Sequence, residues 1–238
     1  MGLISSDSFK NVGYFSRDFR EGSSLNLLNN RIKEAIDKKN LKELIWKNNY
    51  KNALDLYPTV RMYDDIFIDI LIENNIPRII KELTNIDLIL CNIHLRVATS
   101  GSKYLSWHRD RYFFGSPGYK IFYYPQLSNN KDHVLSIVKG TKKNVPHIKK
   151  NIFKQKINTA LNSLHRIRNK VIKINSDNCK YHFVDTSILH APAPVKEGNN
   201  SVRLIYFFCQ KHQLERFPED YDIDTMKIYK EKLKLNTF

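Results

Sequence analysis

Cysteine, proline and glycine are all scarce in this chain, which has 238 residues but only 3 cysteines, 8 prolines and 8 glycines. The cysteines, Cys91, Cys179 and Cys209, are odd in number and far apart. This pattern fits buried thiols in a reducing compartment better than a disulfide framework or a zinc site. We therefore expect no disulfide partner. No stretch rich in glycine, proline or serine divides the chain, so we expect residues 1–238 to form a single domain.

Long hydrophobic runs are also missing. No apolar segment is long enough to span a bilayer, and the N-terminus lacks the charged-then-apolar pattern of a signal peptide. Hydrophobic residues still make up 42% of the chain and aromatic residues 12%, which is enough for a sizeable core and excludes a disordered chain. These features favour a cytoplasmic globular protein with no membrane partner.

Acidic residues are outnumbered, with 24 against 39 basic residues and a formal charge of +15. Such a charge attracts nucleic acid, anionic surfaces or acidic substrates. The chain is also rich in lysine, asparagine and isoleucine, as AT-rich coding produces, and its lysines are scattered. No basic helix or arginine–aromatic platform stands out. Solvated surface is therefore the favoured interpretation, and a nucleic-acid partner is not favoured.

The first third of the chain has helical patterning. After an irregular lead-in over residues 1–22, apolar residues recur at helical spacing, and Asn40 with Glu43 resembles a capping box. We expect residues 1–85 to form a mostly helical supporting layer. Its predicted helices cover residues 24–36, 40–54, 66–72 and 77–83.

The pattern then changes to short β-rich segments separated by turns, which is typical of a sandwich or barrel over residues 86–210. One helix, predicted over residues 146–168, interrupts this core, either as a lid or as a cover for a sheet edge. Residues 211–238 form a tail with a predicted helix. The expected strands cover residues 86–90, 93–97, the surroundings of His108, 119–124, 133–138, 171–174, 181–185 and 202–209.

The most informative residues are His108 and Asp110, because positions i and i+2 of an extended strand share a face. One imidazole and one carboxylate are two-thirds of the facial triad that holds non-haem Fe(II). The best candidate for the third ligand is His190, after the apolar strand near residue 183. Taken alone, His108 and Asp110 could be a surface ion pair, and His190 could be a structural histidine at a strand end.

A second signal is Arg203, which lies in the apolar run of residues 202–207. A buried guanidinium needs an anionic partner, and its planar fork suits a carboxylate. That carboxylate could belong to a ligand or to an acidic residue of the protein.

Three segments resemble the Fe(II)/2-oxoglutarate-dependent oxygenases, and within them the phytanoyl-CoA dioxygenase-like family. Residues 104–114 look like the W-H-x-D segment, residues 137–143 like the P-G-S-H turn, and residues 183–203 like the distal histidine and arginine strands. Lys139, Thr141 and Lys142 stand where the family's turn has Pro, Ser and His. Aspartate at position 110 indicates a hydroxylase rather than a halogenase.

The resemblance implies a mainly β fold with added helices (α+β), built on a double-stranded β-helix of the jelly-roll or cupin type. It implies that His108, Asp110 and His190 bind Fe(II), that Arg203 binds 2-oxoglutarate, and that O2 is the co-substrate. The implied reaction hydroxylates a small organic molecule and converts 2-oxoglutarate and O2 to succinate and CO2.

Other residues near these segments are weaker candidates. Thr141, like Arg96 and Lys120, is a candidate to reach 2-oxoglutarate or substrate, and spacing does not choose among them. The candidate substrate contacts are Tyr104, Trp107 and Arg111, which flank the His108 segment; the aromatic ones could equally be core residues. Arg109 and Arg111 could also be solvated.

Two alternative functions remain open. The chain could be an oxidative demethylase of nucleic acid that uses the same cofactors, although such enzymes usually carry a second arginine on the last strand, which is absent after Arg203. It could also be a non-catalytic cupin-like binding domain. Iron-dependent binding of 2-oxoglutarate would separate the enzymes from the binding domain.

Overall fold

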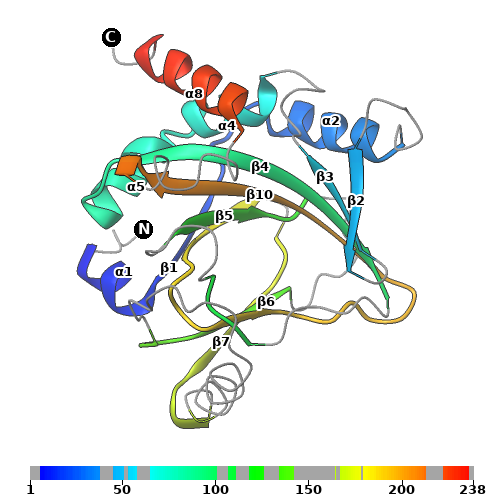
Figure 1. Cartoon of the computed structure of the whole chain (residues 1–238), viewed down its shortest axis with the longest axis vertical. Helices are drawn as coiled ribbons and strands as arrows, with labels where there is room; N and C mark the ends of the chain where they lie inside the picture. Colours follow the sequence, from blue (N-terminus) through cyan, green and yellow to red (C-terminus); the bar gives the residue numbers. More distant parts are fainter. Residues whose placement is uncertain are drawn as a thin grey trace.

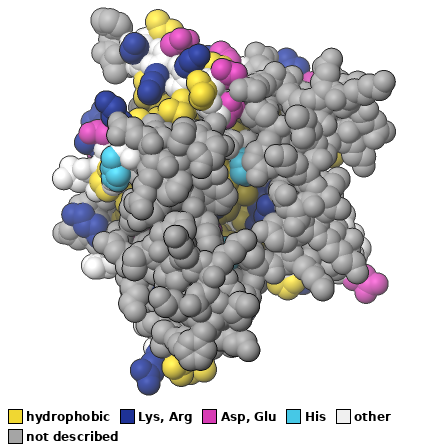
Figure 2. Space-filling view, viewed as in Figure 1, with side chains coloured by type: hydrophobic (Ala, Val, Ile, Leu, Met, Phe, Trp, Pro, Cys, Tyr) yellow, Lys and Arg dark blue, Asp and Glu magenta, His cyan; other side chains and the backbone are white. Residues whose placement is uncertain are grey.

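Two antiparallel sheets and a layer of helices make up the computed structural model (Figure 1). The structure describes residues 6–37, 45–50, 53–57, 65–100, 107–110, 118–125, 134–141, 164, 167–177, 179–212 and 222–235. Within these ranges, no helix has the length and apolar character needed to cross a membrane. On the face shown in Figure 2, the described basic side chains lie among acidic and hydrophobic ones.

The larger sheet has seven strands in the order β1-β8-β5-β10-β4-β3-β2, and the smaller has the order β7-β6-β9. Strands that are far apart in sequence are neighbours, so the sheets fix distant segments relative to one another. The strands are β1 (Tyr14–Asp18), β2 (Ile45–Tyr50), β3 (Ala53–Tyr57), β4 (Leu88–Thr99), β5 (Tyr119–Tyr123), β6 (Leu135–Val138), β7 (Val171–Ile174), β8 (Lys180–Asp185), β9 (His190–Pro192) and β10 (Asn200–Gln210).

Helices cover the outer face of the larger sheet, above β4 and β10 in Figure 1. Their apolar stripes pack against the outward side chains of the sheet and form one hydrophobic core with them. The tail contains the helix that the sequence predicts, and this helix contacts β4. The helices are α1 (Ser6–Val12), α2 (Leu25–Asp37), α4 (Ile66–Glu73), α5 (Ile76–Thr84) and α8 (Ile223–Leu235).

A second core fills the space between the two sheets. Strand β10 shows how the two cores are divided, because its side chains alternate between them. Leu204 and Tyr206 belong to the helix-side core, whereas Ile205 and Phe207 belong to the inter-sheet core. By the same alternation Arg203 shares the inner face of β10, and it is 3% exposed.

Several strands of this core match the sequence prediction, and the mainly β fold with added helices is confirmed. The helix expected over residues 40–54 is wrong where the structure describes it, because β2 and β3 form a hairpin there. Strand β3 pairs with β4 from Ala53 opposite Ala98 to Leu56 opposite Leu95. The hairpin therefore satisfies the backbone groups along one edge of β4, a tertiary contact that local spacing cannot show.

Three smaller expectations also change. The lead-in over residues 1–22 contains α1 and β1, and the two strands expected within residues 86–97 are the single strand β4. Cys91 and Cys209 are buried as expected, but Cys179 is exposed because it precedes β8 in a turn; all three are free thiols. The predicted helix over residues 146–168 lies outside the described residues except at positions 164, 167 and 168.

Candidate metal centre

His108 and His190 are held together by their backbones. The N–H of each residue donates to the carbonyl oxygen of the other, and both distances are 2.9 Å. This isolated bridge joins residues 107–110 to the start of β9, which pairs in turn with β6. The two rings then lie side by side, with centroids 4.4 Å apart. The expected strand around His108 is thus only a bridge in the described residues, but it brings the two histidines together.

Asp110 is fixed by the turn that follows β8. Its N–H donates to the carbonyl oxygen of Thr186 at 3.0 Å, and Thr186 donates from both its N–H and its hydroxyl to the carbonyl oxygen of Gly118. The same turn is closed by Asp185, which accepts from the N–H and the hydroxyl of Ser187. Asp185 therefore stabilises the turn through its side chain.

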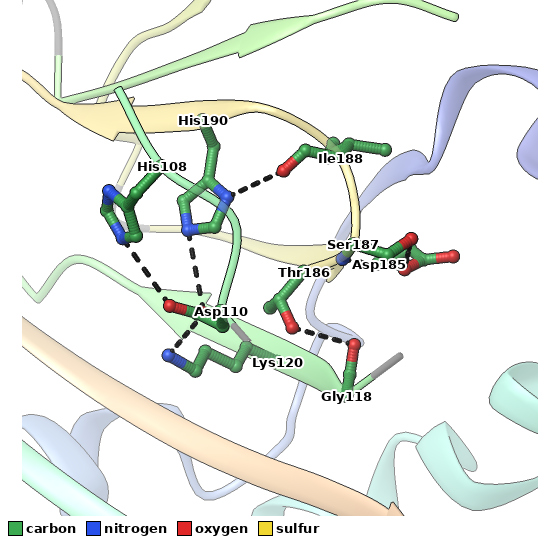
Figure 3. A network of polar contacts seen from close by, with 9 residues as sticks. All are labelled: His108, Asp110, Gly118, Lys120, Asp185, Thr186, Ser187, Ile188 and His190. Atoms are coloured by element: carbon green, nitrogen blue, oxygen red, sulfur yellow. Dashed lines mark hydrogen bonds and ion pairs between the residues drawn. The ribbon is translucent and has the colours of Figure 1, made fainter. Parts of the chain in front are cut away.

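The three side chains converge on one point (Figure 3). His108 Nε2 lies 3.4 Å from Asp110 Oδ1, and His190 Nε2 lies 3.5 Å from Asp110 Oδ2. All three ligand atoms lie within 4.8 Å of one another. Side-chain exposure is low, at 23% for His108, 10% for Asp110 and 4% for His190.

The charges at this point favour a carboxylate next to neutral imidazole. Burial alone would raise the pKa of Asp110, but the nearby Lys120 ammonium outweighs this effect and holds that pKa well below its usual range. Burial lowers the pKa of His190, and the neighbouring His108 adds to the effect. Ionised carboxylate and neutral imidazole are the protonation states that bind a metal.

His190 is also oriented from behind. Its Nδ1 lies 3.0 Å from the carbonyl oxygen of Ile188, which can only accept, so Nδ1 carries the proton and Nε2 presents its lone pair toward Asp110. Thr141 holds Leu189, the residue before His190. The Thr141 hydroxyl accepts from the N–H of Leu189 and donates to the carbonyl oxygen of Val138. The Thr141 hydroxyl is thus engaged in joining β6 to the His190 segment.

Arg109 supports the same region from the other side. Its Nε and Nη2 donate to the carbonyl oxygen of Thr141 at 3.3 and 3.1 Å, and the residue is only 6% exposed. The sequence leaves open whether Arg109 is solvated. In the structure it is buried and joins the His108 segment to the turn after β6. Of the predicted substrate contacts, Trp107 is partly buried next to His108, whereas Tyr104 and Arg111 lie outside the described residues.

Lys120 is the residue whose place the sequence did not predict. It lies on the inner face of β5, and its Nζ is 2.7 Å from Asp110 Oδ2. From the sequence, Lys120 is one of several residues that could contact 2-oxoglutarate or substrate, and the spacing does not distinguish among them. Its position depends on the pairing of β5 with β8 and β10, which no local pattern encodes.

No known protein family and no curated protein matches the sequence. Solved structures do match its fold. The non-heme α-ketoglutarate-dependent carbocyclase SnoK from nogalamycin biosynthesis is similar with a TM-score of 0.67 at 8% identity, over 88% of this chain and 84% of that one. HygX from Streptomyces hygroscopicus, solved with nickel and 2-oxoglutarate bound, is similar with a TM-score of 0.59 at 11% identity, over 89% and 88% of the two chains.

EctD from S. alaskensis, solved with bound Fe, gives a TM-score of 0.58 at 10% identity, over 87% of this chain and 76% of that one. The chain has the fold of these non-heme 2-oxoglutarate-dependent enzymes. At identities this low, structural similarity establishes the fold and nothing beyond it. The shared fold confirms the jelly-roll core that the resemblance implied. The narrower phytanoyl-CoA dioxygenase-like assignment stays a prediction.

The residues present fit a divalent metal. Separations of 3.4 and 3.5 Å between the carboxylate and the imidazoles are ones that a single ion with bonds of about 2.1 Å spans. Two imidazoles and one carboxylate form the donor set of non-haem Fe(II) sites with open positions. The Nδ1–H of His190 already has the outer hydrogen bond that metal-bound histidines usually make.

Proposed function

We propose that this protein is a non-haem Fe(II)- and 2-oxoglutarate-dependent oxygenase that hydroxylates a small organic molecule. One observation carries the proposal. His108, Asp110 and His190 converge between the two sheets of a jelly roll, on the side of the larger sheet where Arg203 also lies. An iron-bound dicarboxylate requires a triad that holds the metal and a buried guanidinium, in the same interior space, that pairs with the second carboxylate.

Each of these residues has a distinct role in the proposal. His108, Asp110 and His190 hold the metal, and their backbone bonds keep them in place before it arrives. Arg203 pairs with the carboxylate of 2-oxoglutarate that lies away from the metal, because its guanidinium can bind both oxygens at once. When bound, Fe(II) and 2-oxoglutarate supply the oxygen activation, with succinate and CO2 as by-products. No side chain has to act as a general acid or base.

The proposed substrate is a small molecule of the kind that the structural neighbours bind. HygX has been solved with hygromycin B, and SnoN with nogalamycin RO. We propose that Trp107 contributes to the substrate side of the site because it adjoins His108 and is partly exposed. Tyr104 and Arg111 remain proposed contacts from the same segment, and Thr141 remains a proposed neighbour of 2-oxoglutarate.

An anaerobic titration with Fe(II) and 2-oxoglutarate tests the cofactor pair. The chelate of these two ligands has a weak visible charge-transfer band, which we expect in the wild type. We expect no band in His108→Ala and a weaker band, with lower affinity for 2-oxoglutarate, in Arg203→Ala. His212→Ala and Arg78→Ala are matched controls, because both residues are exposed and lie outside the site.

The outcome that sinks the proposal is a folded wild type with no band. That result would favour a non-catalytic cupin-like domain. A band in the wild type, together with salt-dependent binding of single-stranded DNA or RNA, would instead favour the nucleic-acid demethylase.

A further inference from the structure

Lys120 is a cation in direct contact with the proposed metal centre. It sits on β5 opposite Phe207 of β10 and Val184 of β8, so its side chain enters the inter-sheet space with theirs. Only 12% of the side chain is exposed. Its Nζ lies 4.5 Å from the centre of the Phe207 ring, a cation–π contact that holds the ammonium in place.

The Lys120 ammonium and the proposed metal both need Asp110. Nζ is 2.7 Å from Oδ2, the oxygen that faces His190 Nε2 at 3.5 Å, while Oδ1 faces His108 (Figure 3). The carboxylate is therefore already neutralised before a metal binds. A divalent ion that enters the triad has to share this carboxylate with a positive charge, which weakens its binding.

The same ammonium favours an anion. A triad with one carboxylate leaves a bound divalent ion with net positive charge, and Lys120 adds to it inside a space with little solvent. A dianionic 2-oxo acid that approaches the metal compensates both charges at once. The metal and the dianion should therefore strengthen each other's binding by more than chelation alone provides, and linkage requires this gain to be equal in both directions.

We infer that Lys120 is a positioning residue that couples metal binding to the binding of the dianionic co-substrate. It holds Asp110 in the metal-free protein, lowers the affinity of the bare triad for a divalent ion, and raises the affinity of the metal-loaded site for 2-oxoglutarate. The protein then retains its metal well only when the co-substrate is present. This inference rests on the proposed function.

Calorimetric titration with Ni(II), a stand-in for Fe(II) that does not oxidise in air, tests the coupling. The wild type and Lys120→Met are titrated with Ni(II), each with and without saturating 2-oxoglutarate. We expect Lys120→Met to bind Ni(II) alone about tenfold more tightly than the wild type, and to gain about tenfold less from 2-oxoglutarate. Changes of this size lie within the usual range of coupling between two sites, about 5- to 150-fold.

Three further variants isolate the charge. Lys120→Arg keeps it and should keep most of the coupling, whereas Lys120→Gln keeps a donor for Asp110 without the charge and should behave like Lys120→Met. Lys120→Gln also serves if Lys120→Met does not fold, as judged by circular dichroism. Lys173→Met is the matched control, because Lys173 is exposed on β7.

The possible results separate the two proposals. Ni(II) and 2-oxoglutarate binding that is the same in Lys120→Met, Lys120→Gln and the wild type would overturn the coupling but leave the oxygenase intact. Weaker Ni(II) binding in both uncharged variants would also overturn it, because Lys120 would then only orient Asp110. A wild type that binds no Ni(II) would overturn the proposed function and, with it, the coupling.

Discussion

His108 and His190 bond to each other in both directions through their backbones, each N–H to the other's carbonyl oxygen at 2.9 Å. The pairing lies within a network of backbone bonds that includes β6, β9 and the turn after β8. The imidazoles are therefore brought together by the fold itself. This differs from small zinc domains, whose ligands meet only when the metal binds.

Metal removal should leave the protein folded but less stable. We expect a chelator to preserve the circular dichroism spectrum, and Ni(II) at 100 times its dissociation constant to add about 2.7 kcal/mol to the free energy of unfolding. Urea titrations with chelator and with Ni(II) measure both effects. His190→Ala should abolish the gain and His212→Ala should retain it. Unfolding by the chelator alone would show that the metal, rather than the backbone pairing, assembles the site.

Thr141→Val should weaken both the fold and the metal site. The substitution preserves the shape of the side chain but removes the hydroxyl that accepts from the N–H of Leu189, leaving that buried donor unsatisfied. The expected loss is about 1–3 kcal/mol in the free energy of unfolding. Because Leu189 precedes His190, the affinity for Ni(II) should also fall, whereas Thr141→Ser should keep both properties.

The control for this variant is Thr225→Val. Thr225 is also buried and donates to Asp222 at the start of α8, away from the metal centre. This variant should lose stability and keep its affinity for Ni(II). Equal losses of affinity in the two valine variants would mean that Thr141 acts only through global stability.

Gly13→Ala should damage the turn that carries His190. Gly13 has φ +70°, and an added Cβ would lie 2.5 Å from Cγ2 of Ile188, whose carbonyl oxygen accepts from His190. Gly198→Ala is a matched control, because φ is +74° there and nothing lies within 4 Å. Urea unfolding should show a loss of about 1–2 kcal/mol for Gly198→Ala from backbone strain and clearly more for Gly13→Ala.

Binding completes the comparison of the two glycines. Only Gly13→Ala should lower the affinity for Ni(II), since only there must the Ile188 segment move. Similar stability and similar Ni(II) affinity in both variants would show that the turn can shift without disturbing His190.

The sequence predicts several strands of the core well, because short β-rich segments bounded by turn residues are a local signal. Residues 171–174 are the whole of β7, and residues 202–209 lie within β10. The hairpin of β2 and β3 escapes prediction for the opposite reason. Its spacing fits a helix, and only the open edge of β4 makes it a sheet. Strand β4 lies about forty residues further along the chain, so the residues of the hairpin do not themselves indicate that they pair with it.

The candidate site is likewise predictable from the sequence only in part. His108, Asp110 and His190 could be named from their residue types and order, and the structure brings them together; that they bind a metal stays a prediction. Lys120 and Arg109 could not be placed. Their contacts with Asp110 and Thr141 depend on strand register and on a loop, so they follow from the fold and not from spacing.

The stability of the protein should fall as the pH is lowered from about 6.5 to about 4, in part because of His182. This histidine is 3% exposed, lies between the rings of Tyr14 and Tyr124, and hydrogen-bonds the Tyr14 hydroxyl through Nδ1. Burial lowers the pKa of His182 from 6.5 to about 4. Between these values the unfolded chain binds a proton that the folded protein does not.

The contribution of His182 to stability is therefore fully present above pH 6.5 and is lost as the pH falls toward 4. The slope approaches about 1.4 kcal/mol per pH unit, for a total of about 3 kcal/mol. Urea midpoints of the wild type and His182→Gln between pH 7.5 and 4.5, with chelator present, isolate this histidine because Asp110 and His190 are common to both. The variant should be less stable at neutral pH and should lose less on acidification. Parallel curves would mean that His182 takes up its proton in the folded protein as easily as in the unfolded chain.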